Sequence, residues 1–387
     1  MAIKRSPLLP CRLAASLVAV ASLLLCTVGV SHAAQPAPPP ALAGRAAAQR
    51  AAYARAMTRV TLVLKWVPQA QFAGYYVALK KGYYAKEGLD VRIQPGGPDI
   101  VPESVVENGG ANFGLDWLPS LLTQRDHGQD LVNVAQIFQT TGMRLIAFKS
   151  SGITSPADFR GKKIGVWYSG NQYQFLAWMA KLGYNPDKDM TVIHQSFSMD
   201  LFLSHKLDLA SAMTYNELGV VLESGVKLNQ LVIFDYGKAG VSMLEDGIFA
   251  RASYLKAHRD VAVRFLKASI LGWQDVVRDP VYAGKLAFSY SPAGASTMAH
   301  QIYMAREVVK LMWWGPARTH GIGYMDPVAF TRTAQLSLRY GLIHKMPSGA
   351  YDQSYWAEAV KELAAQHLLM KSGMEERRLS GSAPTAG

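Results

Sequence analysis

Short apolar runs alternate along the chain with segments whose apolar residues recur at helical spacing. Val60–Leu64 is β-branched and apolar and predicts a strand. Gln71–Lys81 then shows helical spacing, and Leu89–Ile93 predicts a second strand. Val101–Asn108 predicts a further helix, and Asn112–Asp116 predicts a third strand. This alternation implies an α/β unit in which helices cover both faces of a parallel sheet.

A second series of the same kind begins near Ser151. Ser155–Asp158 is a capping box with proline at the first helical position, so a helix is expected to begin there. Gly247–Ala250 predicts a strand that returns to the first unit, and Arg259–Arg278 predicts a long amphipathic helix. Further strands are predicted at Lys162–Trp167, Met190–His194, Leu209–Tyr215 and Leu231–Phe234, and a helix at Gln172–Leu182.

Two α/β units joined by two crossings of the chain form the layout of a hinged ligand clamp. The crossings are predicted near Lys149–Gly152 and Glu245–Ala250. The sequence thus predicts a first lobe from 59–149, a second lobe from 150–246, and a return to the first lobe with C-terminal helices over 247–370.

The two ends of the chain differ in composition from this body. Lys4, Arg5 and Arg12 precede the uncharged apolar run Leu13–Val30, and small residues flank His32, which is the pattern of a cleavable secretory signal over residues 1–33. An uncleaved anchor is the alternative. Residues 34–58 are predicted to be a Pro/Ala-rich linker and residues 371–387 a flexible tail.

Cleavage after residue 33 would change the chemistry of the mature chain. Both cysteines, Cys11 and Cys26, would leave, so disulfides and thiolate catalysis are not expected. The formal charge would fall from +12 to 12 − 3 = +9. This excess is spread along the chain without a nucleic-acid motif, so no nucleic-acid partner is expected.

Two motifs carry a resemblance to a known family. Residues 65–78, KWVPQAQFAGYYVA, are followed by Lys81–Tyr84 and Glu87–Val91, and Asp158–Gly165 forms a second motif. Together they resemble the family of ABC-importer periplasmic binding proteins and thiamine-pyrimidine synthases. The resemblance implies the two-lobed type II periplasmic-binding-protein fold, a periplasmic location and a permease in the inner membrane as partner. A monomer is expected.

One branch of that family is enzymatic, and its reacting groups are missing here. The synthases carry pyridoxal phosphate on a lysine, use a histidine and have a cysteine-rich segment. The matching positions hold Asp116, Ser120 and the cysteine-free stretch Gly240–Leu244. A carboxylate cannot form a Schiff base. We therefore expect a binding protein with no cofactor and no enzymatic activity.

The ends of the predicted strands indicate what the cleft binds, because ligands of α/β proteins lie beyond the carboxyl ends of strands. Aromatic residues recur there, which suits a flat ring, and carboxylates recur, which suits N–H donors. Arginine, the residue that usually binds anions, is absent from these strand ends. A pyrimidine precursor of thiamine fits best. Riboflavin also fits, whereas an alkanesulfonate, taurine or nitrate fits less well, although N–H groups after Ser169–Asn171 could hold an anion.

Each candidate residue also has a structural interpretation. Trp66 could belong to the core, Ser169–Asn171 and Tyr215–Glu217 could begin helices, and Glu245 could pair with a lysine. His194, His205 and His258 lack metal-ligand spacing, so no metal site is expected. The predicted ligand-binding residues are Trp66, Gln71, Asp116, Trp117, Ser169, Gly170, Asn171, Tyr215, Asn216, Glu217 and Glu245.

Overall fold

The computed structural model describes residues 57–370. The predicted signal (1–33), the tail (371–387) and nearly all of the predicted linker lie outside the described residues. The linker prediction extends one residue too far, because the first strand already begins at Thr58. Within residues 57–370, no helix combines the length and the apolar character that a membrane crossing requires.

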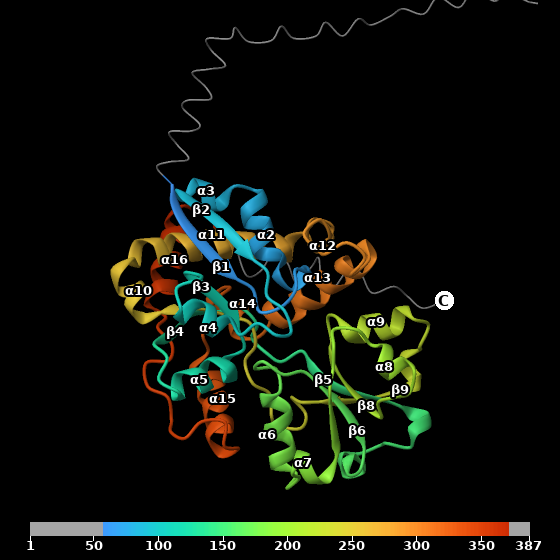
Figure 1. The fold of residues 1–387 in the computed structure, drawn as a ribbon. Coiled ribbons are helices and arrows are strands. Elements are labelled where there is room, and N and C mark those ends of the chain that lie inside the picture. The colour runs from blue at the N-terminus through green and yellow to red at the C-terminus, as the bar shows by residue number, and fades with distance from the viewer. Residues whose placement is uncertain (1–56, 371–387) are drawn as a thin grey trace, which may run out of the picture. The chain divides into compact units, whose positions relative to one another are not determined.

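The first lobe is built on a five-stranded sheet in the order β2-β1-β3-β10-β4 (Figure 1). Its strands are β1 (Thr58–Val63), β2 (Leu89–Gln94), β3 (Phe113–Asp116), β4 (Leu131–Gln136) and β10 (Gly247–Arg251). β1 runs parallel to β2 and β3, whereas β10 runs antiparallel to β3 and β4. The sheet is therefore mixed, because the strand that returns from the second lobe enters it in the opposite direction.

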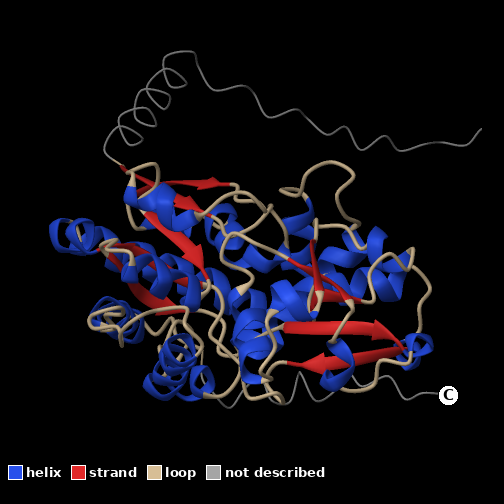
Figure 2. Cartoon of the chain, turned by 60° about the horizontal axis from the view of Figure 1, so that its bottom comes forward, coloured by secondary structure: helices blue, strands red, loops and turns tan. Residues whose placement is uncertain are grey.

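The second lobe has a sheet of its own, in the order β7-β6-β8-β5-β9. Figure 2 shows the strands, in red, in two separate groups. β6 runs parallel to β7 and β8, and β5 runs antiparallel to β8 and β9. The expectation of purely parallel sheets is thus wrong for both lobes. The strands are β5 (Met143–Phe148), β6 (Lys163–Val166), β7 (Thr191–His194), β8 (Leu209–Met213) and β9 (Leu231–Asp235).

The first crossing lies earlier in the chain than the sequence predicted. β5 pairs with strands of the second sheet, so the chain leaves the first lobe at residues 137–142 and not near Lys149–Gly152. The return runs through residues 236–246, just before β10. The prediction missed β4 and β5, because β4 is buried at every position and therefore shows no alternation of polar and apolar residues.

Helices surround both sheets, and the capping box predicted at Ser155–Asp158 is present at the start of a short 3-10 helix. The α-helices are α2 (Ala73–Lys80), α3 (Tyr83–Lys86), α4 (Pro102–Glu107), α5 (Leu118–Asp126), α6 (Tyr173–Lys181), α7 (Pro186–Asp189), α8 (Asp200–Leu203), α9 (Glu217–Glu223), α10 (Ala252–Ala257), α11 (Arg259–Arg278), α12 (Pro280–Phe288), α13 (Met298–Met312), α14 (Pro316–His320), α15 (Pro327–Arg339) and α16 (Ser354–Ala365). The 3-10 helices are η1 (Ala70–Phe72), η2 (Lys149–Ser151), η3 (Pro156–Phe159) and η4 (Leu228–Gln230).

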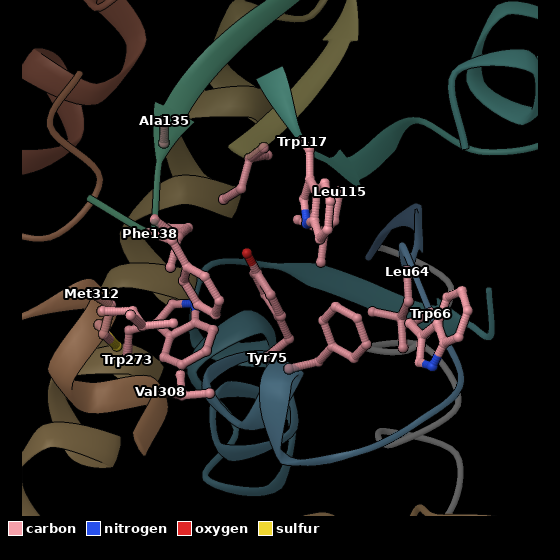
Figure 3. Packing of buried hydrophobic residues seen from close by; sticks show 14 of the residues in the cluster. Leu64, Trp66, Tyr75, Leu115, Trp117, Ala135, Phe138, Trp273, Val308 and Met312 are labelled. Carbon is pink, nitrogen blue, oxygen red and sulfur yellow. The ribbon is translucent and has the colours of Figure 1, made fainter. Parts of the chain in front are cut away.

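A close contact between α2 and α11 fixes the position of η1, the segment before α2 that lies at the edge of the cleft. A Cβ atom added at Gly272 would lie 2.1 Å from the Gly74 carbonyl oxygen, so only glycine allows the two helices to pack at this distance. Tyr75 packs edge-on against Trp273 with ring centroids 5.5 Å apart, and Figure 3 shows both rings within the buried core. This packing holds η1, which precedes α2, at the edge of the cleft.

Candidate ligand-binding site

A small pocket lies where the ends of β1, β3, β6 and β8 meet between the two lobes. Its volume, including the opening, is about 310 Å³. Seven of the predicted residues line it: Trp66, Gln71, Trp117, Asn171, Tyr215, Asn216 and Glu217. Its other lining residues are Lys65, Gln69, Trp167 and Met213. Asp116, Ser169, Gly170 and Glu245, which were also predicted, are not among the lining residues.

Aromatic side chains from both lobes form the walls of this pocket. Trp66 follows β1, and its ring meets that of Trp167, which follows β6, edge-on at 6.3 Å. Tyr215 follows β8 and packs edge-on against Phe138 at 5.9 Å. All three pocket rings are buried. A flat ligand between these strand ends would therefore meet ring faces or edges from either lobe.

A chain of side-chain amides leads from the first lobe to a buried carboxyl group. Gln69 Nε2 donates to Gln71 Oε1 at 2.8 Å, and Gln71 Nε2 donates to Asp246 Oδ2 at 2.7 Å. The indole N–H of Trp117 donates to Asp246 Oδ1 at 3.0 Å. Asp246 therefore fixes the orientation of both Gln71 and Trp117, and with it the arrangement of donors in the pocket.

Burial raises the pKa of Asp246 to about 7, with the Gln71 hydrogen bond opposing and the charges of Glu245 and Asp116 adding to the shift. Because the folded chain retains this proton above the ordinary value of 3.8, the free energy of unfolding should fall as the pH rises from about 4 to about 7. Asp246→Asn should reduce this fall in urea unfolding curves. Asp90→Asn, at an exposed position, is the control and should leave it unchanged. An unaltered fall in Asp246→Asn would contradict the assignment.

Asp116 is paired within the protein and does not line the pocket. Lys65 Nζ lies 2.8 Å from Asp116 Oδ1, and both side chains are almost fully buried. Lys65 Nζ also donates to the Ser169 carbonyl oxygen in the second lobe at 2.9 Å. The sequence did not indicate Lys65 as a site residue, although it lies in the first motif. Its ammonium group connects the two lobes beneath the pocket.

The turn at Ser169–Asn171 has a structural role. Several of its polar groups are bonded within the protein and do not form a free anion site. Ser169 has a φ of 56°, and the Gly170 N–H donates to the Gln172 side chain at 3.0 Å. A Cβ atom at Gly170 would lie 2.5 Å from Ser120 Oγ, so glycine is needed for the approach of the two lobes. Asn171, which lines the pocket, donates to the Tyr168 carbonyl oxygen at 2.7 Å.

Glu103 is a buried carboxyl group that sequence reasoning missed. Burial, with a smaller contribution from the negative charge of Asp116, holds its pKa well above the usual range, while Lys65 opposes the shift. These conditions favour the protonated form of Glu103 beside the Lys65–Asp116 pair. In the sequence, an acidic residue in the first turn of α4 resembles an ordinary helix-stabilising charge.

Glu245 is held by donors from the first crossing and from α6. Gly142 N donates to Glu245 Oε2 at 2.9 Å, and Gln174 Nε2 donates to Oε1 at 2.8 Å. The Thr141 hydroxyl donates to Oε1 as well. These bonds stabilise the crossing segment. The sequence left open that Glu245 has a structural role, as the partner of a lysine. In the structure its partners are hydroxyl and amide donors instead.

Glu217 and Asn216 lie side by side at the start of α9 and line the pocket. Glu217 accepts from the Met213 N–H at 2.9 Å and from Asn216 Nδ2 at 2.7 Å. Burial raises the pKa of Glu217 to about 7, and these hydrogen bonds oppose the shift. The carboxyl group can thus be present in either protonation state near neutral pH. Asn216 Oδ1 faces His300 Nε2 at 2.9 Å.

Metal binding has no support in the described part of the chain. No group of three or more His, Asp or Glu side chains within residues 57–370 is placed to hold a metal ion. The pocket residues are instead suited to a neutral or weakly charged organic ligand, with stacking surfaces, amide groups and a carboxyl group that can donate or accept.

Comparisons with known proteins agree with this architecture. The family described as NMT1/THI5 like matches residues 69–283. The riboflavin-binding protein RibY of Chloroflexus aurantiacus is 26% identical over 74% of this chain and 82% of its own. A formylaminopyrimidine-binding protein of Halalkalibacterium halodurans is 23% identical over 58% of this chain and 68% of its own.

The solved structures confirm the predicted fold. The periplasmic nitrate-binding protein NrtA of Synechocystis superposes with a TM-score of 0.60 over 82% of this chain and 92% of its own. Its sequence is 14% identical, so this similarity concerns the fold alone. The two-lobed type II periplasmic-binding-protein fold, with helices after the return to the first sheet, is the fold of this chain.

Proposed function

Because the chain belongs to the NMT1/THI5-like family, we propose that it is the solute-binding component of an ABC importer for a small flat heterocycle. The ligand that we favour is a pyrimidine precursor of thiamine. The two relatives described above bind a flavin and a formylaminopyrimidine, according to their names, and both ligands are flat nitrogen heterocycles.

The observation that carries this proposal is the composition of the pocket wall. Trp66, Trp117 and Tyr215 line the pocket and offer stacking surfaces for a flat ring. Glu217 can pair with an amino group beside a ring nitrogen, because its pKa near 7 lets the carboxyl group accept or donate. An aminopyrimidine presents that pair of donor and acceptor on one edge.

A small anion is disfavoured by the same residues. No arginine lines the pocket, and the charge of Lys65 is balanced by Asp116. In the turn that precedes α6, the Gly170 N–H is already bonded to the Gln172 side chain. Sulfonates, taurine and nitrate therefore lack the charged donors that usually hold them.

Riboflavin is the second candidate, and one specific feature favours it. A wider groove of about 1450 Å³, open to solvent, adjoins the pocket and shares Trp66, Gln69 and Asn216 with it. A ligand larger than a pyrimidine could extend into this groove while one ring remains between the tryptophans.

The mechanism that we propose is closure of the lobes on the ligand, followed by docking of the closed form on a permease. The two crossings, 137–142 and 236–246, would act as hinges. Export to the periplasm remains a prediction from residues 1–33. Synthase activity is disfavoured, because Asp116 stands where the lysine would be and Ser120 where the histidine would be.

A calorimetric ligand panel tests the proposal. We expect measurable heat and saturable binding for 4-amino-5-hydroxymethyl-2-methylpyrimidine or its formylamino relative, weaker or comparable binding for riboflavin, and none for taurine, an alkanesulfonate or nitrate. Selective binding of one of the anions would contradict the proposal, whereas a preference for riboflavin would replace the favoured ligand by the second candidate.

A further inference from the structure

His300, on α13, lies behind the pocket at the contact between the lobes. Its side chain is buried, with 3% of the residue exposed. α13 packs on α12 and η1 of the first lobe and also touches α9 of the second lobe. In Figure 1, α13 and α9 lie near one another. His300 lines the adjoining groove and not the pocket itself, and it contacts Asn216, which lines both.

Both ring nitrogens of His300 face oxygen atoms of the second lobe. Nδ1 lies 3.0 Å from Glu223 Oε1, and Nε2 lies 2.9 Å from Asn216 Oδ1. The orientation of the Asn216 amide is fixed, because its Nδ2 donates to Glu217 at 2.7 Å. A neutral imidazole carries one N–H and can satisfy only one of these acceptors, whereas an imidazolium donates to both.

The neighbouring residues hold α13 against α9 at this point. The Tyr303 hydroxyl, also on α13, donates to the Thr214 carbonyl oxygen at 2.7 Å. A Cβ atom at Gly219 would lie 2.4 Å from Tyr303 Cε1 and 3.1 Å from His300 Cε1, so the helices approach as closely as glycine permits. The two helices are therefore closely packed where the lobes meet.

We propose that His300 is a positioning residue that orients Asn216 toward the ligand. When its imidazole is charged, it also holds the two lobes together by hydrogen bonds. Closure then favours the imidazolium, because only the charged ring donates to both acceptors, so ligand affinity should fall as the pH rises. The titratable groups that face His300 are Glu223 and, through Asn216, Glu217 on α9, with Tyr303 beside it on α13.

Affinity measured against pH in matched variants tests this inference. The probe is 4-amino-5-hydroxymethyl-2-methylpyrimidine, titrated calorimetrically from about pH 6 to about pH 8. In the unmodified protein we expect affinity to fall about tenfold or more across this range, as for the loss of one charge-assisted hydrogen bond. His300→Gln keeps a donor for Asn216 but cannot be charged, so it should show a smaller fall. Glu223→Gln removes the partner charge and should act in the same direction.

The control is His258→Gln, which changes an exposed histidine before α11 and should keep the full dependence on pH. Glu217 and Asp246 also titrate near neutral pH, so only the part of the pH dependence that is lost in His300→Gln and kept in His258→Gln is assigned to His300. An identical pH profile in His300→Gln and the unmodified protein would overturn the proposal.

Solution scattering of the ligand-free chain separates this inference from the proposed function. The unmodified protein should have a larger radius of gyration at about pH 8 than at about pH 6, and His300→Gln should lose this difference. If the probe fails to bind at any pH, that result counts against the proposed ligand, and scattering alone decides on His300. A radius that responds to pH equally in both proteins would contradict the role given to His300.

Discussion

Asp116→Asn is expected to lower the free energy of unfolding by about 3–5 kcal/mol, because it leaves the Lys65 ammonium buried without a counter-charge. The two side chains lie 2.8 Å apart with almost no solvent exposure. Chemical denaturation measures the effect. Asp116 was predicted from the sequence to accept hydrogen bonds from the ligand, and its pairing with Lys65 changes the expected consequence from lost affinity to lost stability.

Glu103 could reduce this effect by ionising in place of Asp116, since it is the neighbouring buried carboxyl group. Adding Glu103→Gln to Asp116→Asn removes that possibility. The free energy of unfolding should then fall by the full amount expected for an unpaired buried ammonium group. Lys65→Met combined with Asp116→Asn removes both charges and should recover at least half of the loss. If Asp116→Asn alone and Asp116→Asn combined with Lys65→Met had equal free energies of unfolding, the role of the buried pair would be contradicted.

An exposed ion pair is the control for these variants. Asp260 is paired with Arg264 on α11 at 2.7 Å, and its side chain is 72% exposed. Asp260→Asn should therefore change the free energy of unfolding by no more than about 0.5 kcal/mol. A comparable loss in this control would mean that burial does not explain the effect at Asp116.

Trp66→Ala is expected to weaken binding of the favoured ligand roughly 30- to 100-fold, because truncating a buried tryptophan contact typically costs about 2–3 kcal/mol. Trp66 lines both the pocket and the adjoining groove and meets Trp167 edge-on. Calorimetric titration with the aminopyrimidine measures the change. Trp66 lies beyond the end of β1 but is buried, so circular dichroism should first confirm that the variant is folded.

Trp314→Ala is the matched control, since Trp314 is 53% exposed and does not line the pocket. Its affinity should equal that of the unmodified protein. If Trp66→Ala and Trp314→Ala bound the ligand with equal affinity, Trp66 would have no stacking role. It would then be a core residue, which is the alternative that the sequence left open.

Local patterns in the sequence were sufficient for most of the fold. The strands β1, β2 and β3 and the helix α11 were predicted within a few residues, because each shows its own apolar spacing. β5 escaped notice, and the first crossing was therefore misplaced. Strand direction also depended on long-range pairing: β10 enters between β3 and β4, which no local pattern indicates.

The site was predicted in part for the same reason. Strand ends identified Trp66, Trp117 and Tyr215, since the position of a strand end follows from the strand itself. The partners of the carboxylates did not follow, because Lys65 and Asp116 are 51 residues apart, and Glu245 and Gly142 are 103 apart. Whether a buried carboxylate serves the ligand or the protein depends on such distant neighbours, so sequence alone could not separate the two roles.

Mass spectrometry of the small molecules released when freshly purified protein is denatured identifies the ligand that the pocket holds. We expect a flat nitrogen heterocycle at close to one molecule per chain: an aminopyrimidine, or a flavin if the second candidate is correct. Trp66→Ala should release much less of the same compound. Recovery of an aliphatic sulfonate, taurine or nitrate in that stoichiometric amount would contradict the ligand class proposed for this pocket.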